Sequence, residues 1–126
     1  MDRKYRLLII DDNEEILTSL KSFLSKKDYD VVSASNGLDA LKLIEAATDD
    51  FDLVITDLVM PNISGVAVIT ILKKKYPKIP IIAITGWGEH PESLATEAKA
   101  DLVMEKPFEL AELEASIRSF FPNESK

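Results

Sequence analysis

Three aspartates stand directly after two apolar segments, where a carboxylate more often serves chemistry than packing. The run Leu-Leu-Ile-Ile at 7–10 ends on Asp11 and Asp12, and the run Leu-Val-Ile-Thr at 53–56 ends on Asp57. If these segments are neighbouring strands, the three carboxylates converge. Like charges a few ångströms apart cost on the order of several kcal/mol at a protein-like dielectric. Because a bound cation removes that cost, the pattern predicts a cation site at these aspartates.

The elements that must position the aspartates are strand-like apolar segments alternating with segments of helical periodicity. Nearly continuous Val, Ile and Leu in the strand segments indicates a sheet covered by helices on both faces, and the alternation predicts an α/β, doubly wound parallel sheet. The predicted strands are 5–10, 30–34, 53–56, 79–85 and 102–104. Helical periodicity is clearest from Ile16 to Leu24 and weakest at 92–99, so the helix over 92–99 is expected to be the loosest.

The topology of such a sheet gathers the candidate site residues. Crossovers between parallel strands are right-handed, and ligands bind beyond the carboxyl ends of the strands. Asp11, Asp12, Asp57, Thr85 and the loop after Met104 are therefore expected on one edge of the sheet.

Composition limits the kind of protein and of partner. With 126 residues and 46% hydrophobic content, the chain suits one domain over 1–126, with a core at about 5–121. The net charge of −7 argues against nucleic acid or an anionic membrane as a direct partner. The absence of cysteine excludes disulfides and a zinc finger, while no signal-like or membrane-spanning run is visible. A cytoplasmic location is expected.

Four motifs together resemble the receiver domains of two-component response regulators, over essentially the whole chain. Each motif alone is weak, but four in order at these separations are specific. The resemblance implies a flavodoxin-like receiver fold, a five-stranded parallel sheet of order 2-1-3-4-5 with five helices. The motifs are Ile9-Ile10-Asp11-Asp12-Asn13, Thr56-Asp57-Leu58-Val59-Met60-Pro61 with Gly65, Thr85-Gly86, and Lys106-Pro107-Phe108.

The resemblance implies a phosphoacceptor signalling switch. Asp57 would accept a phosphoryl group from a phosphohistidine of a sensor kinase or histidine phosphotransfer protein, in a reaction that needs Mg²⁺ and that Lys106 and Thr85 assist. Such a domain phosphorylates itself and slowly dephosphorylates itself, but turns over no metabolic substrate. By the same resemblance the metal ligands are Asp12, Asp57 and the backbone carbonyl of Val59, with Asp11 acting through water.

Two further implications concern the response to phosphorylation. The phosphoryl group would draw Thr85 inward and change the partner-binding surface, but Val103 occupies the position where the family usually couples an aromatic residue to that threonine. The sequence leaves open whether the usual aromatic switch is replaced in this chain. Val59 and Trp87, both apolar, would border the phosphoryl group, and we expect them to hinder the attacking water and prolong the phosphorylated state.

The implied partner is a four-helix phosphotransfer or kinase dimerisation domain. We expect it to dock near four residues that fringe the acidic edge, and the receiver to be a monomer or a phosphorylation-dependent homodimer. The four are Asn13, Ile16, Leu17 and Phe108. The sequence leaves open the cognate kinase, the output pathway and whether the chain stands alone or is cut from a larger regulator or hybrid kinase.

Other interpretations of the same residues remain. A Mg²⁺-dependent phosphatase or phosphotransferase could use Asp57 as nucleophile, although the second acid it needs would fall at Val59. A phosphorylation-independent interaction scaffold is a third possibility. Asp11-Asp12-Asn13 could also cap the following helix, the run 73–75 could be a solvated helix end, and His90 is expected at the surface.

Overall fold

The computed structural model describes residues 5–46, 51–58, 65–86, 100–106 and 108–121. The helix expected over 92–99 lies outside these ranges. The strands are β1 (Arg6–Ile10), β2 (Asp30–Ala34), β3 (Leu53–Asp57), β4 (Ile81–Thr85) and β5 (Leu102–Glu105). The helices are α1 (Glu14–Lys26), α2 (Gly37–Ala46), α3 (Gly65–Lys75) and α5 (Leu110–Ser119). Every predicted strand is confirmed to within two residues at each end.

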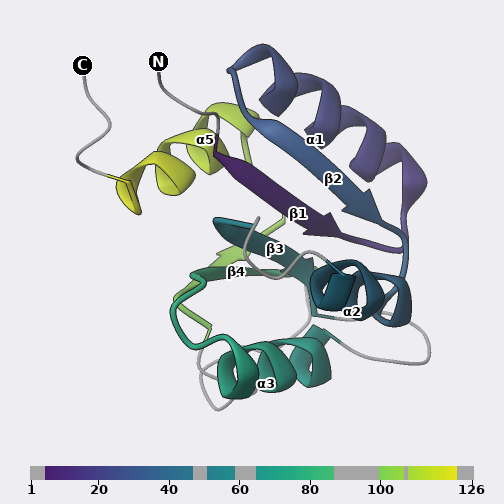
Figure 1. The fold of residues 1–126 in the computed structure, drawn as a ribbon. Helices are drawn as coiled ribbons and strands as arrows, with labels where there is room; N and C mark the ends of the chain where they lie inside the picture. Colours follow the sequence, from purple (N-terminus) through teal and green to yellow (C-terminus); the bar gives the residue numbers. More distant parts are fainter. Residues whose placement is uncertain (1–4, 47–50, 59–64, 87–99, 107, 122–126) are drawn as a thin grey trace.

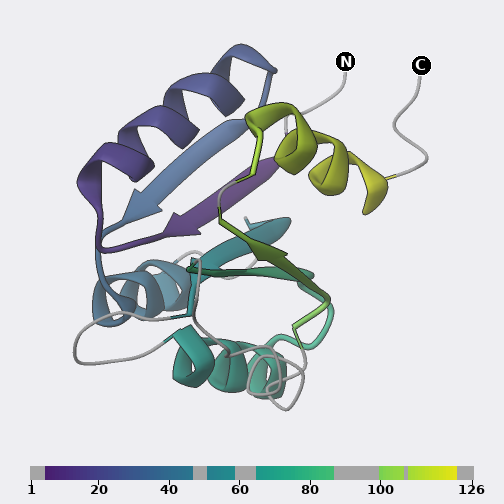
Figure 2. The same ribbon diagram turned by 180° about the vertical axis from the view of Figure 1, so that it is seen from behind.

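The five strands form one parallel sheet in the order β2-β1-β3-β4-β5, which confirms the predicted fold. The register pairs Ile10 with Thr56 and Asp57 with Ile84, so β1, β3 and β4 end at the same edge. Figures 1 and 2 show α1 and α5 on one face of the sheet and α2 and α3 on the other. The edge that carries Asp57 is therefore the predicted one.

The core has two halves, one on each face of the sheet. Leu7 and Ile9 of β1 pack in the half that includes α1 and α5, whereas Leu8 and Ile10 pack in the half that includes α2 and α3. All four side chains are at most 1% exposed. Burial on both faces explains why the strands are continuous aliphatic runs rather than alternating ones.

Helix α1 begins and ends with local hydrogen bonds that its own sequence supplies. The Asn13 side chain accepts hydrogen bonds from the backbone N–H groups of Glu15 and Ile16, at 2.9 and 3.2 Å. At the other end Asp28 has φ 76°, and the bonds from its N–H to the Ser25 carbonyl and from the next residue to Leu24 form a Schellman motif. The capping alternative is thus correct for Asn13, which leaves Asp11 and Asp12 for the site.

The predicted solvated helix end at 73–75 is wrong for Lys73. Its side chain is 16% exposed, with Nζ 2.6 Å from Asp101 Oδ2 and 3.2 Å from the Ile79 carbonyl oxygen. The same Oδ2 accepts a hydrogen bond from the Ile81 N–H at 2.7 Å. Lys73 therefore links the end of α3 to the starts of β4 and β5, while Lys74 is exposed as expected.

Candidate functional site

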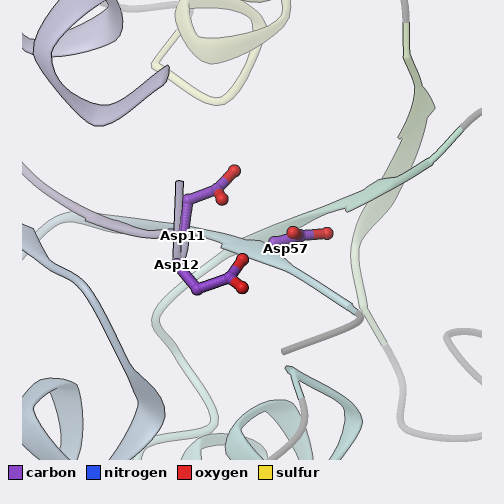
Figure 3. Close-up of side chains that lie close together, drawn as sticks. All are labelled: Asp11, Asp12 and Asp57. Atoms are coloured by element: carbon purple, nitrogen blue, oxygen red, sulfur yellow. The ribbon is translucent and has the colours of Figure 1, made fainter. Parts of the chain in front are cut away.

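The three predicted aspartates lie together at the carboxyl ends of β1 and β3 (Figure 3). One carboxylate oxygen from each of Asp11, Asp12 and Asp57 lies within 4.8 Å of the others. Asp11 is 2% exposed and Asp57 7%, whereas Asp12 is exposed. Ligand oxygens around an octahedral Mg²⁺, at about 2.1 Å from the metal, stand roughly 3–4 Å apart. The three carboxylates are the donor type that Mg²⁺ prefers, and oxygens within 4.8 Å of one another can hold one ion directly or through water.

Asp11 is the carboxylate that burial affects most. Removal from water raises the pKa of Asp11, although the Asn13 N–H at 2.9 Å and the charge of Lys106 act in the opposite direction. The nearby charge of Asp12 raises this pKa further. A cation bound beside such a carboxylate stabilises its charged form.

Lys106 supplies positive charge between the two strand ends. Its Nζ lies 3.5 Å from Asp11 Oδ2 and 3.8 Å from Asp57 Oδ2. The backbone N–H of Lys106 donates to the Thr85 carbonyl at 2.8 Å, which fixes the residue directly after β5 beside the end of β4. The predicted lysine is therefore in the site, within reach of the group that Asp57 would carry.

Thr85, the last residue of β4, brings a buried hydroxyl to the same edge. Thr85 is 0% exposed, and its Oγ1 has no hydrogen-bond partner among the residues that the structure describes. Leaving a buried polar group unpaired costs about 1–3 kcal/mol. An oxygen ligand seated at the site could accept this hydrogen bond and recover that cost.

Several predicted residues are not tested by this geometry. Val59, Trp87 and His90 lie outside the described ranges. Val103 is partly buried and packs against the core half of α2 and α3.

Of the four predicted docking residues, Asn13 is exposed and caps α1, while the other three separate into two groups. Ile16 and Phe108 are partly exposed and line a shallow groove between α1 and the start of α5. Leu17 is only 7% exposed and belongs to the core, so its inclusion in the docking surface was wrong. The rest of the groove is formed by Glu15, Ser19, Leu20, Lys106 and Leu110.

Sequence reasoning placed Gly65 in a motif but missed its contact with the peptide between Asp57 and Leu58. Gly65 opens α3, and its backbone N–H donates to the Leu58 carbonyl at 3.0 Å. The one signal in the sequence was a glycine eight positions after the aspartate.

Comparisons with known proteins agree with this arrangement. The family model of the response regulator receiver domain matches residues 7–118. The alkaline phosphatase synthesis transcriptional regulatory protein PhoP of Bacillus subtilis is 35% identical over 115 residues, which are 90% of this chain and 47% of that protein. The response regulator MprA of Mycolicibacterium vanbaalenii is 36% identical over 115 residues, which are 90% of this chain and 49% of that protein. The chain thus spans about half the length of these curated relatives.

Solved structures agree as well. A response regulator receiver domain protein from Clostridium thermocellum has a TM-score of 0.85 and 30% identity, with 91% of this chain and 92% of that chain covered. A CheY-like receiver domain protein from Methanospirillum hungatei has a TM-score of 0.88 and 28% identity, with 95% of each chain covered. Among the described residues, no helix is long and apolar enough to cross a membrane. The chain belongs to the response regulator receiver domain family.

Proposed function

We propose that this receiver domain is a phosphoacceptor switch that takes a phosphoryl group onto Asp57 from a phosphohistidine of a sensor kinase or phosphotransfer protein. The observation that carries the proposal is the convergence, at one sheet edge, of the Asp57 carboxylate, two further aspartates, the Lys106 ammonium and the buried Thr85 hydroxyl, which has no partner among the described residues. Phosphoryl transfer requires mainly that the protein position the reacting groups and neutralise charge, and the residues at this edge can do both.

The reaction is a displacement at phosphorus. A carboxylate oxygen of Asp57 forms the new O–P bond while the P–N bond of the donor breaks, and the imidazole nitrogen leaves with the electron pair and takes up a proton. Lys106 Nζ, 3.8 Å from Asp57 Oδ2, is placed to neutralise an equatorial phosphoryl oxygen. The Thr85 hydroxyl would donate to another phosphoryl oxygen, which gives its buried Oγ1 the partner that it lacks among the described residues.

The acidic cluster is suited to Mg²⁺, which the family uses. We propose that Asp12 and Asp57 bind the ion directly, together with the Val59 carbonyl, and that Asp11 acts through water. When bound, the ion neutralises charge on the phosphoryl oxygens. Asp11, held by the Asn13 N–H, would orient that water from the buried side.

Two finer parts of the proposal concern the lifetime of the phosphorylated state and the conformational response to phosphorylation. Val59 and Trp87 would border the phosphoryl group and hinder the attacking water, so that hydrolysis is slow. Autodephosphorylation equally fast in wild type and in a Val59→Asn, Trp87→Ala variant would contradict this. Thr85 would carry the response, with Val103 in place of the aromatic partner usual in the family.

The kinase or phosphotransfer partner is proposed to dock on the groove that Ile16 and Phe108 line beside Lys106. Ile16→Glu should slow transfer from such a partner at least tenfold but leave small-molecule phosphorylation unchanged. Leu38→Glu is the matched control, because Leu38 is 50% exposed on α2, across the sheet from this groove. Equal transfer rates in both variants would remove this groove from the proposal.

We further propose that residues 1–126 form a single receiver domain that acts in the cytoplasm, as a monomer or a phosphorylation-dependent dimer. The direct test of the function is intact mass after incubation with acetyl phosphate and Mg²⁺. We expect one phosphoryl group on the wild type, and none on Asp57→Asn or on wild type with excess EDTA. No gain in the wild type, with Mg²⁺ binding confirmed separately, would favour the scaffold alternative.

A further inference from the structure

The first residue of α3 touches the backbone of the proposed phosphoacceptor. A Cβ atom built on Gly65 would lie 1.9 Å from the Asp57 carbonyl oxygen, 2.7 Å from Leu58 Cα and 2.8 Å from the Asp57 carbonyl carbon. Cβ atoms essentially never approach closer than 3.0 Å, so a side chain would force a shift of 3.0 − 1.9, or 1.1 Å. All three contacted atoms are backbone, so no flexible side chain can absorb that shift.

Hydrogen bonds hold the same stretch of backbone in place. The Gly65 N–H donates to the Leu58 carbonyl at 3.0 Å, and the Leu58 N–H donates to the Ile84 carbonyl of β4 at 2.9 Å. The buried Thr56 hydroxyl donates at 3.0 Å to the Asp57 carbonyl oxygen, the same atom that a Cβ on Gly65 would meet. The peptide that follows the acceptor is thus fixed from β4, from α3 and from β3 itself.

We infer that Gly65 is a positioning residue for Asp57, with Thr56 as a second residue that holds the same carbonyl group. The inference rests on the proposed function of Asp57. The side chain of Asp57 branches from the Cα next to the contacted carbonyl, so a displaced peptide turns or moves the carboxylate. The carboxylate would then lose its place 3.8 Å from Lys106 Nζ and within 4.8 Å of the other carboxylate oxygens.

The expected size of the effect follows from that displacement. A misplacement of about 1 Å at a reacting group can lower a rate on the order of 10²-fold. Gly65→Ala should therefore reduce the phosphorylation rate constant, at saturating Mg²⁺ and saturating acetyl phosphate, by about 10²-fold. It should also weaken Mg²⁺ binding to the unphosphorylated protein, because Asp57 is one of the clustered oxygen donors.

The experiment compares Gly65→Ala with wild type in two assays: calorimetric titration with Mg²⁺ and initial rates of phosphorylation with acetyl phosphate. Leu72→Ala is the matched control, because Leu72 is a buried core residue about two turns further along α3. The folded control should keep a rate within threefold of wild type. A Gly65→Ala rate within threefold of wild type, or an equal loss in Leu72→Ala, would overturn the inference.

A second variant keeps the test decisive if Gly65→Ala does not fold. Thr56→Val is nearly isosteric and replaces the hydroxyl that holds the Asp57 carbonyl with a methyl group, which cannot donate a hydrogen bond, so we expect a rate several-fold below wild type. An unchanged rate in that folded variant would overturn the inference. If the wild type itself takes up no phosphoryl group, the proposed function fails, while unchanged Mg²⁺ affinity in Gly65→Ala would separately reject the positioning role.

Discussion

Replacing Tyr29 with phenylalanine removes one hydroxyl group, and we expect it to lower the free energy of unfolding by about 1.5–3 kcal/mol, the usual net value for a hydrogen bond to a charged group. Tyr29 Oη donates to Glu114 Oε2 at 3.1 Å, and the two residues are only 7% and 8% exposed. Arg118 holds the same carboxylate through bonds of 2.9 and 2.8 Å, but its side chain is 66% exposed. The substitution thus leaves a buried carboxylate held by a largely exposed guanidinium.

The assay is urea unfolding at pH 7 for wild type and Tyr29→Phe. Tyr76→Phe is the matched control, because the Tyr76 hydroxyl has no hydrogen-bond partner among the described residues and Tyr76 is partly exposed. We expect the control to stay within 0.5 kcal/mol of wild type, as is usual for a surface substitution. A loss below about 0.5 kcal/mol in Tyr29→Phe would refute the energetic value given to this hydrogen bond.

The pH dependence gives an independent check. Burial, together with the Glu114 carboxylate, raises the pKa of Tyr29 well above its ordinary 10.0. The folded state therefore holds the phenol proton where the unfolded chain has released it, and stability falls as the pH rises above 10. The stabilising contribution is complete below that pH, so the difference between wild type and Tyr29→Phe should shrink above it. Parallel alkaline unfolding curves would contradict this.

Three further outcomes are expected. Asp28→Gly should raise the free energy of unfolding by roughly 0.5–1 kcal/mol in urea, because Asp28 has φ 76° at a C-terminal helix cap, and a loss of stability would contradict this. Asp11→Asn should stabilise the metal-free protein at pH 7, because a carboxylate whose pKa is raised by folding contributes stability only at low pH. The same substitution should weaken Mg²⁺ binding. A lower stability of the metal-free variant would contradict the first expectation. Lys106→Met should tighten Mg²⁺ binding several-fold while slowing phosphorylation, because the ammonium lies near two of the carboxylates; unchanged Mg²⁺ affinity would exclude that competition.

The fold and the acidic edge could be predicted because both follow from local patterns. Aliphatic runs that end on carboxylates mark the strand ends, and parallel topology brings those ends to one edge. Asn13 is the N-cap, while Asp11 and Asp12 stay available for a cation. The sequence predicts that both roles, helix capping and cation binding, occur among these three residues. Only the backbone geometry shows which residue has which role.

Pairings between distant residues could not be predicted from local patterns. The hydrogen bond between Tyr29 and Glu114 joins residues 85 positions apart, and the close ion pair of Lys73 depends on where α3 ends relative to β5. Leu17 illustrates a different limit. Ile16 and Leu17 are both apolar and adjacent, and the rotation of α1 against the sheet decides that Leu17 is buried and Ile16 lines the groove.

The most direct test is to locate the phosphoryl group in the wild-type protein, since loss of labelling in Asp57→Asn could also follow from a disturbed metal site. The protein is phosphorylated with acetyl phosphate and Mg²⁺, the acyl phosphate is trapped with hydroxylamine, and the modified residue is identified by peptide mass spectrometry. We expect a single hydroxamate, on Asp57. A stable phosphate on the adjacent Thr56, or a hydroxamate on Asp11 or Asp12, would contradict the assignment of Asp57 as the phosphoacceptor.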